Sequence, residues 1–379
     1  AGGVKMLISV GGADSGPSFS VATADSVNRV NFINSVATFL EYNSYDGIDI
    51  DWESPSDSAD EAQLTSLIQG LRAKFNQLDS SWLITMAIPP TANFSSYFDY
   101  PQLTSYVNWY NVMCYDFVGS WCTYTGHDSP LYYNTLDPNA GADSNSVLYL
   151  YDVGRGIPKS KLVIGVPFYA DQFNAPGLFQ KLTNNSVPNV FYADIVTDID
   201  SGWTYHWDNM SEVPWLENPA QTEFITYEDT NSIKLKVQYC VRQQLGGIMI
   251  WEITQDLYNG TQPLLETMGR TLKQLTSVTP GPTVVSSYKL YNNFPNPFNP
   301  TTVISYQLSA NSYVMLKVYD VLGREVATLV DGQKLSGKHE VNFDGNKLSS
   351  GVYFYSLAVR TDRSGAGSFS QTKKMLLIK

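Results

Sequence analysis

The sequence predicts a parallel α/β domain followed by a smaller all-β domain. In the first part of the chain, short apolar segments alternate with longer segments whose apolar residues recur at helical spacing, which is typical of a parallel α/β fold. After Leu275 the pattern changes to short alternating strands separated by turn residues, which is typical of a β-sandwich. A length of 379 residues leaves room for both domains.

The α/β domain is predicted to span residues 1–275. Apolar segments of strand length occur at six places, and helical spacing occurs between several of them. The expected strands are Lys5–Val10, Asp46–Glu53, Leu83–Ile88, Trp109–Tyr115, Leu162–Phe168 and Gly247–Trp251. The expected helices are Ser26–Tyr42, Ala62–Phe75 and Ser232–Gln244. Acidic side chains follow three of these strands, at Glu53, Asp116 and Glu252, where barrels of parallel strands place their active sites.

The segment Asp46–Glu53 carries the clearest chemical signal. From Ile48 onward the residues alternate, so Asp49, Asp51 and Glu53 share one face of the strand while apolar residues occupy the other. Because like charges raise one another's pKa, at least one proton is expected among the three carboxylates, and Glu53 is placed to be a protonated acid. The cleavage of a glycosidic bond requires such an acid. A solvated edge strand is the alternative, and the apolar residues between the acids weigh against it.

The composition restricts the classes of partner. The formal charge is -12 and the pI about 4.7, so nucleic acid and anionic membrane are poor partners, whereas neutral sugar is compatible. No apolar run approaches a membrane span. Cys114, Cys122 and Cys240 form no metal motif, and no metal or cofactor is expected. The cysteines are interpreted as small buried residues, and a Cys114 to Cys122 disulfide is left open.

The run Asp46–Glu53 resembles the D-x-x-D-x-D-x-E signature of glycoside hydrolase family 18, the chitinase family, at every acidic position. Four further motifs of the family occur in order at Ser9–Gly12, Met113–Asp116, Gly165–Tyr169 and Gly246–Trp251. Gly11 and Gly12 in the first of these would let the backbone approach a ligand closely. The resemblance implies retaining, substrate-assisted hydrolysis of β-1,4-linked N-acetylglucosamine in chitin or chitooligosaccharides, in which the substrate's own N-acetyl oxygen attacks the anomeric carbon.

By the same resemblance, the acidic residues have separate roles. Glu53 would protonate the glycosidic oxygen and later act as a base toward water. Asp51 would hold the acetamido N–H and stabilise the oxazolinium ion, and Asp49 would share its proton. Asp46 precedes the alternating stretch and is interpreted as a structural partner of this cluster.

The resemblance also implies substrate contacts from Met113, Tyr115, Asp116, Trp121, Tyr169 and Trp251. Tyr115 and Asp116 would bind the acetamido group from the side opposite Asp51. Trp251 would form the floor under the cleaved sugar, and Trp121 would lie on the leaving-group side. Core packing is the alternative for the two tryptophans and for Tyr169.

The family fold is a TIM (β/α)8 barrel whose fourth strand carries the acidic motif. We therefore expect a barrel that lacks its first two β/α units, as a truncated piece of a longer hydrolase would. The stretch between Tyr169 and Gly246 is expected to be too short for the full α+β insertion domain of processive relatives, which would leave a shallow groove suited to internal cleavage. Two rival functions are an endo-β-N-acetylglucosaminidase acting on N-glycans and a non-catalytic chitin-binding lectin. Trp52 and Trp251 favour chitinase over the first, and Glu53 favours hydrolysis over the second.

Residues 276–287 are predicted to form a linker, and residues 288–379 an Ig-like β-sandwich of roughly 90 residues. Its expected strands are Val303–Leu308, Val314–Tyr319, Glu325–Val330, His339–Phe343 and Val352–Val359. Three segments resemble the C-terminal sorting domain of the bacterial type IX secretion system: Asn293–Thr302, Val318–Asp320 with Gly323, and Lys373–Lys379. This resemblance implies export to the cell surface or the medium through the type IX machinery. A generic sugar-binding module is the alternative, and the absence of Trp from the region weighs against it.

Overall fold

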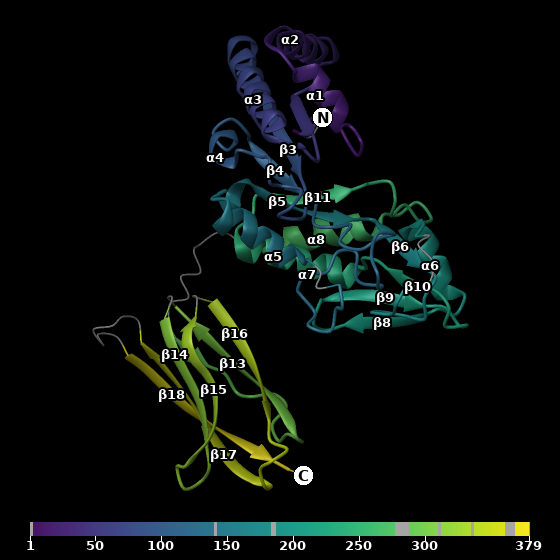
Figure 1. The fold of residues 1–379 in the computed structure, drawn as a ribbon. Coiled ribbons are helices and arrows are strands. Elements are labelled where there is room, and N and C mark those ends of the chain that lie inside the picture. The colour runs from purple at the N-terminus through teal and green to yellow at the C-terminus, as the bar shows by residue number, and fades with distance from the viewer. Residues whose placement is uncertain are drawn as a thin grey trace. The chain divides into compact units, whose positions relative to one another are not determined.

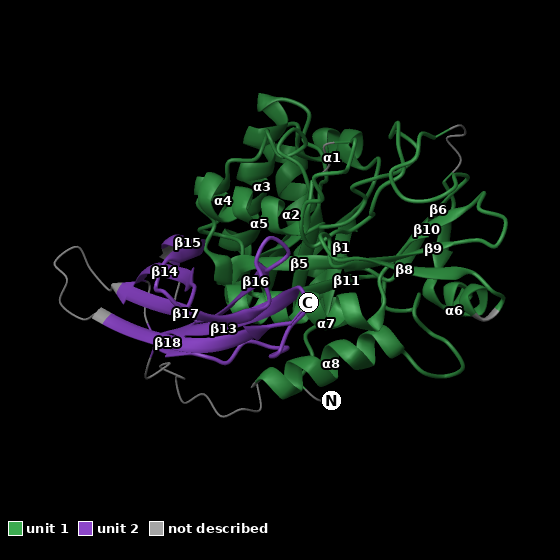
Figure 2. Cartoon of the chain, turned by 90° about the horizontal axis from the view of Figure 1, so that it is seen from below, with its two compact units in different colours: residues 1–277 green, residues 278–379 purple. Residues whose placement is uncertain are grey.

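The computed structural model describes residues 3–139, 142–182, 187–276, 288–309, 312–334, 337–360 and 368–378. The chain divides into two compact units, Ala1–Ser277 and Val278–Lys379 (Figure 2). The predicted linker spans residues 276–287, of which residues 277–287 lie outside the described residues.

A six-stranded parallel sheet forms the centre of the first unit (Figure 1). Its strands, in spatial order, are β1 (Leu7–Gly11), β2 (Gly47–Asp51), β3 (Leu83–Ile88), β4 (Trp109–Val112), β5 (Leu162–Pro167) and β11 (Gly247–Trp251). Each neighbouring pair is parallel. The six strands confirm the predicted α/β class, and β1 and β11 each have one partner strand among the described residues.

The helices of this unit cover the sheet and supply its core. They are α1 (Gly16–Thr23), α2 (Ser26–Asn43), α3 (Ser58–Leu78), α4 (Tyr100–Leu103), α5 (Ser144–Tyr149), α7 (Thr230–Gln243) and α8 (Pro263–Thr276), with short π and 3-10 turns at Leu150–Gly154 and Lys159–Lys161. Asp25 begins α2, where its side chain accepts the backbone N–H groups of Val27 and Asn28. Leu40 of α2 and Ile48 of β2 are fully buried in the same core cluster, so the apolar face of β2 is the face that the helices cover.

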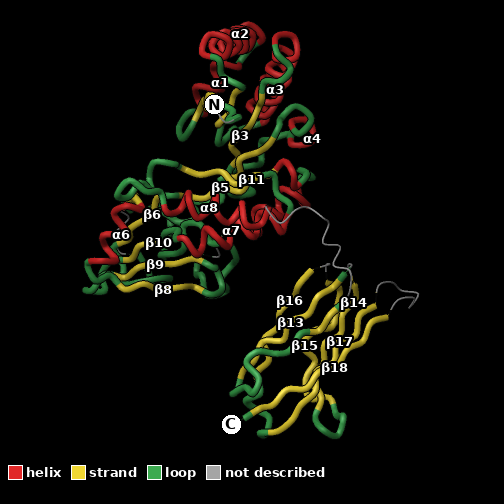
Figure 3. The backbone as a smooth tube through the Cα atoms, turned by 180° about the vertical axis from the view of Figure 1, so that it is seen from behind, coloured by secondary structure: helices red, strands yellow, loops and turns green. Residues whose placement is uncertain are grey.

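A second, antiparallel sheet is inserted between β5 and α7 (Figure 3). Its elements are β6 (Tyr169–Phe173), β7 (Asn189–Phe191), α6 (Tyr192–Asp200), β8 (Thr204–Asp208), β9 (Val213–Glu217) and β10 (Phe224–Thr226), with the strand order β7-β6-β10-β9-β8. This stretch therefore forms an α+β insertion of its own, against the expectation that it is too short for the full insertion domain. Strands of three to five residues need little chain, so five strands and a helix fit. The shallow groove was expected only because the full insertion was expected to be missing, so the insertion removes the reason for that expectation.

The second unit is a β-sandwich, as predicted. One sheet has the order β12-β13-β16 and the other β15-β14-β17-β18, and all their strand pairs are antiparallel. The strands are β12 (Lys289–Leu290), β13 (Thr301–Leu308), β14 (Ser312–Tyr319), β15 (Glu325–Lys334), β16 (Gly337–Asp344), β17 (Gly351–Arg360) and β18 (Ser368–Leu377). Residues 373–377 of the C-terminal Lys-rich segment, predicted only as a motif, belong to strand β18. None of the helices described in either unit has both the length and the hydropathy that crossing a bilayer requires.

A buried cation connects α7 to the loop that follows β4. Lys236 and Glu228 are 1% and 2% exposed, and Lys236 Nζ donates to Glu228 Oε1 at 2.5 Å and to Ser129 Oγ at 2.6 Å. Ser129 Oγ in turn donates to the backbone oxygen of Cys114 at 2.5 Å. Cys114 is a free cysteine, as are Cys122 and Cys240, so the disulfide that the sequence left open is absent. The ion pair therefore fixes the loop that carries the residues after β4.

We expect Lys236→Met to destabilise the first unit by about 3 to 5 kcal/mol, because Glu228 would stay buried without its partner. Urea denaturation followed by tryptophan fluorescence measures this unit selectively, since all eight Trp lie within residues 1–277. Adding Glu228→Gln should recover part of the loss. Lys234→Met, an exposed change on the same helix, is the matched control. Equal stability of the Lys236 and Lys234 variants would contradict the expectation.

Candidate active site

The predicted site residues gather at one edge of the parallel sheet. Strands β1, β2, β4, β5 and β11 end at or just before Gly11, Asp51, Met113, Phe168 and Trp251. In a parallel sheet the carboxyl ends of all strands meet at the same edge, where loops of different strands can combine into one site. The sequence motifs thus become neighbours through the topology alone.

Donors from three other strands surround Asp49. Ser9 on β1 and Thr85 on β3 are its partners in the sheet register. Ser9 Oγ donates to Asp49 Oδ2 at 2.9 Å, and Thr85 Oγ1 donates to Asp49 Oδ1. Asn111 Nδ2 on β4 donates to the same Oδ1 at 3.1 Å. Asp49 is therefore held in one orientation, two residues before Asp51 at the end of β2.

Asp51 is buried, whereas Asp49 and Glu53 are half-buried. Burial, followed by the negative charges of Glu53 and Asp49, raises the pKa of Asp51 to about 7. Its Oδ1 is buried and has no hydrogen-bond partner among the described residues. Asp51 is thus a carboxyl group that gains or loses its proton near neutral pH.

Two glycines let β1 pass directly beside Asp51. Gly11 and Gly12 have φ values of 132° and 102°, which L side chains rarely adopt. A Cβ atom on Gly11 would lie 2.0 Å from the backbone oxygen of Asp51, and the N–H of Gly12 donates to that oxygen at 2.9 Å. Residue 11 must therefore be glycine for this strand contact to form.

Glu53 lies at the open end of the acidic row. Burial raises its pKa, and the negative charges of Asp116 and Asp14 raise it further. Asp116 follows β4, so the structure brings the ends of two separate strands within electrostatic reach. Trp52, between the acids, is fully buried on the opposite face and stacks on Phe19 at 4.9 Å between ring centroids. Trp52 therefore packs in the core and gives no information about the substrate.

Asp46 lies at the other end of β2. Lys5 Nζ donates to its Oδ1 at 2.7 Å, and the N–H of Met6 donates to its Oδ2 at 2.9 Å. These bonds, that from Lys5 above all, lower the pKa of Asp46. Asp46 thus links β2 to the chain that precedes β1, and these bonds differ from the expected partnership with the other carboxylates.

The residues after β4 and β5 form the opposite wall. Tyr115 is buried, and its ring lies 6.2 Å from that of Tyr169 in an edge contact. Tyr169 donates its O–H to Asp116 Oδ1 at 2.5 Å. Asp116 as a whole residue is exposed, but protein atoms around its carboxylate partly exclude water from it, and this desolvation raises its pKa. The hydrogen bond from Tyr169 acts in the opposite direction. Met113 is half-buried, one residue beyond the end of β4.

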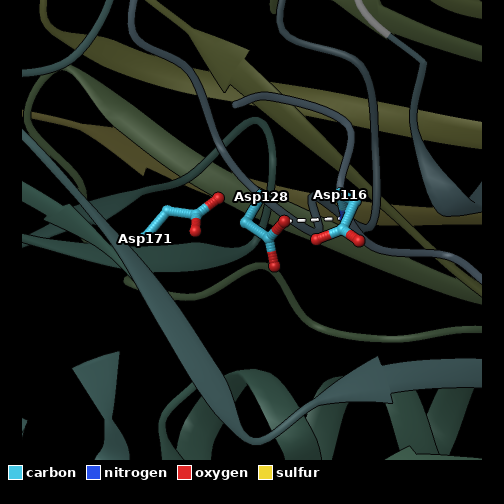
Figure 4. Close-up of side chains that lie close together, drawn as sticks. All are labelled: Asp116, Asp128 and Asp171. Atoms are coloured by element: carbon cyan, nitrogen blue, oxygen red, sulfur yellow. Dashed lines mark hydrogen bonds between the residues drawn. The ribbon is translucent and has the colours of Figure 1, made fainter. Parts of the chain in front are cut away.

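Two buried carboxylates that the sequence analysis did not single out lie beside Asp116. Asp128 lies between Asp171 and Asp116 (Figure 4), and oxygen atoms of the three groups lie within 4.8 Å of one another. Burial and the charge of Asp116 raise the pKa of Asp171 to about 7, and burial raises that of Asp128 well above its usual range. Asp171 follows Tyr169 by two residues, so strand periodicity could have placed both on one face. Asp128 gave no comparable signal, because its loop has no period.

The same three carboxylates are the candidate metal ligands among the described residues. Oxygen donors of this kind suit Ca²⁺ or Mg²⁺. The alternative to a bound cation is that Asp128 and Asp171 are protonated, since a buried carboxyl group without a counter-charge keeps its proton.

The two site tryptophans are exposed, against the core-packing alternative. Trp251 is 52% exposed at the end of β11, and Trp121 is 68% exposed in the loop after β4. Aromatic faces of this kind are available to stack on a sugar ring. Tyr169, by contrast, is buried and bonded to Asp116. The Glu252 carboxylate accepts hydrogen bonds from the N–H and the hydroxyl group of Thr254, two residues later, so Glu252 stabilises its own turn.

Comparisons with known proteins agree with this arrangement. Residues 1–256 match the model for glycosyl hydrolases family 18, and residues 292–367 match that for the secretion system C-terminal sorting domain. Chitinase A1 of Niallia circulans is 30% identical over 291 residues, which are 67% of this chain and 41% of that protein. The chain spans between 41% and 64% of the length of four such curated relatives.

Solved structures give the same assignment. An immunomodulatory active chitinase from Trichuris suis has a TM-score of 0.66 at 27% identity, over 71% of this chain and 80% of that one. Human YKL-39, a pseudo-chitinase with retained chitooligosaccharide binding, has a TM-score of 0.66 at 26% identity, over 71% and 80% of the two chains.

Both resemblances found in the sequence are thereby confirmed. The sorting domain points to secretion or to a cell-surface location. The parallel sheet is of the TIM-barrel type, with six strands among the described residues. Together, the acidic row on β2, the barrel-type sheet and the match over residues 1–256 show that the chain belongs to glycosyl hydrolases family 18.

Proposed function

We propose that this protein hydrolyses β-1,4 linkages between N-acetylglucosamine residues of chitin or chitooligosaccharides, with retention of configuration and with assistance from the substrate's N-acetyl group. The observation that carries the proposal is the row Asp49, Asp51 and Glu53. Burial raises the pKa of Asp51 and of Glu53; the charges of Glu53 and Asp49 raise that of Asp51 further, and the charges of Asp116 and Asp14 raise that of Glu53. A carboxyl group that keeps its proton near neutral pH can act as the general acid. The chitinases among the relatives support the choice of substrate.

Each residue's environment matches one step of this reaction. Glu53, at the open end of the row, protonates the leaving oxygen and then accepts a proton from water. Asp51 accepts the acetamido N–H through its unpartnered oxygen and stabilises the positive oxazolinium ion. Tyr115 and Asp116 hold the acetamido group from the other wall, and Trp251 supports the sugar ring. No second carboxylate has to attack the anomeric carbon, since the substrate supplies the nucleophile.

A second candidate function is the binding of chitooligosaccharides without cleavage. The structural likeness to YKL-39, a pseudo-chitinase that retains such binding, favours it. The retained acid Glu53, with its raised pKa, favours hydrolysis. An endo-β-N-acetylglucosaminidase of the same family would use a similar row of acids on N-glycans, so the substrate has to be tested directly.

Glu53→Gln is expected to lower kcat on a fluorogenic N-acetylglucosamine oligomer by at least ~100-fold, because the amide cannot donate the proton. Glu41→Gln, the same change on the exposed surface of α2, is the matched control and should leave kcat as in the unaltered protein. Product analysis by mass spectrometry, with chitin oligomers and an N-glycopeptide in parallel, identifies the bond that is cleaved. Binding of the oligomer by a folded protein that never cleaves it would establish the lectin function instead.

The pH dependence of kcat/KM is expected to show an alkaline limb near pH 7, where the acidic row loses its shared proton. The charge of Asp49 contributes to the raised pKa of Asp51, so Asp49→Asn should lower that pKa. The alkaline limb would then move to lower pH, in addition to any loss of kcat. A limb that stays in place or moves to higher pH would contradict this coupling.

A further inference from the structure

The exposed indole of Trp121 lies against the backbone of its own turn. The N–H of Cys122 donates to the backbone oxygen of Gly119 at 3.0 Å and so closes the turn Gly119–Cys122. Gly119 is buried, although Trp121 is 68% exposed. A Cβ atom at position 119 would lie 2.4, 2.5 and 2.7 Å from three carbons of the six-membered ring of Trp121. The indole therefore occupies the space that a side chain at position 119 would need.

The three distances also show which part of the indole the glycine covers. The three carbons follow one another around the ring, so a Cβ atom at nearly equal distance from all of them lies over the face of the ring and not beyond its edge. Gly119 is not among the glycines with positive φ. The position thus requires glycine for space and not for backbone conformation, and the exposure of Trp121 comes from the rest of the ring.

Both flanks of this turn are held by the inserted segment. Val118, directly before the turn, is buried in an apolar cluster that includes Phe173 of β6, and Cys122 packs against the same cluster. Beyond the turn, the N–H of Leu182 donates to the backbone oxygen of Thr123 at 2.9 Å. The exposed indole therefore stands on a turn whose two ends are fixed.

The rest of the loop after β4 is anchored as well. Within the loop, the N–H of Asp116 donates to Asp128 Oδ1 at 2.7 Å, and the N–H of Asp128 donates to Thr226 Oγ1 on β10 at 3.0 Å. His127 Nε2 lies 3.0 Å from Asp208 Oδ2 on β8. Because the backbone is held at several points, a side chain added at position 119 would displace the indole and leave the loop in place.

We propose that Gly119 is a specificity-determining positioning residue of the hydrolysis, whose missing side chain seats the Trp121 indole so that its open face is ready to stack on a sugar on the leaving-group side of the cleaved bond. This inference rests on the proposed function. An exposed side chain that is already seated loses less conformational freedom when it binds, so its contact contributes more to affinity. Substrates that extend beyond the cleaved bond gain this contact, whereas a substrate with a small leaving group does not reach the ring.

Gly119→Ala in a Glu53→Gln background is expected to raise the Kd of a chitin hexasaccharide about 3- to 10-fold, the size of one lost aromatic contact. In the active protein, the ratio of kcat/KM for chitotetraose to kcat/KM for diacetylchitobiosyl fluoride should fall by a similar factor, because the departing fluoride makes no contact with Trp121. Gly269→Ala is the matched control, since Gly269 is exposed on α8 and a Cβ atom there meets nothing within 4 Å.

A double-mutant cycle tests whether Gly119 acts through Trp121. In a Trp121→Ala background the space above Gly119 is empty, so adding Gly119→Ala should change neither the Kd nor the kcat/KM ratio further. An equal effect of Gly119→Ala with and without the indole would overturn the proposal. So would an equal loss of kcat/KM on the fluoride and on chitotetraose, because a general distortion of the loop would lower both.

Fluorine NMR of protein labelled with fluorotryptophan tests the seating without any cleavage. The chain has eight Trp, and the resonance of Trp121 is the one that disappears in Trp121→Phe. Gly119→Ala is expected to shift this resonance and to leave the others in place, whereas an unshifted Trp121 resonance would overturn the seating. A protein that shows the shift but neither binds nor cleaves chitooligosaccharides would retain the seating and overturn the proposed function, together with the sugar specificity that rests on it.

Discussion

Keeping three carboxylates in a row at the end of one strand is the constraint on which the rest of the site depends. The surroundings of the acids differ from one to the next. Asp49 accepts hydrogen bonds from side chains of β1, β3 and β4, whereas Oδ1 of Asp51 is buried without a partner among the described residues. Because two of the three donors, Ser9 and Thr85, are register partners of Asp49, its hydrogen bonding depends on the correct pairing of β1, β2 and β3. A slip of one residue would turn the acids into the core and the isoleucines out of it.

The opposite wall of the site, formed by residues after β4 and β5, also holds three carboxyl groups close together, but through different contacts. Asp116, Asp128 and Asp171 come from a loop and from the inserted sheet, and no register aligns them. The Tyr169 hydroxyl donates to the Asp116 carboxylate, and the N–H of Asp116 donates to Asp128, whose Oδ2 is buried without a partner among the described residues. The two acidic groups act on each other across the site, since the charge of Asp116 contributes to the raised pKa of Glu53. Proton affinity here is therefore a property of both walls together.

The sequence was informative wherever a period or a motif could be recognised. Alternation in Asp46–Glu53 correctly separates the buried Ile48 and Ile50 from the acids, and apolar runs locate all six parallel strands. The insertion was missed because strands of three to five residues carry too few alternations to be recognised. Asp128 was missed because its place in the site follows from contacts with Asp116 and Thr226, residues that only the fold brings together. The partners of Asp46 escaped prediction for the same reason, since Lys5 reaches it across a strand pair.

The anchoring of Asp128 by Thr226 has a consequence for how such enzymes diversify. The loop after β4 and the inserted sheet are separate segments of the chain, and the hydroxyl groups of Thr226 and Tyr169 are among the contacts that join them. Substitutions in the insertion can therefore change what surrounds the loop after β4 while the acidic motif stays unchanged. Two chains with the same motif can thus differ in the wall that faces it.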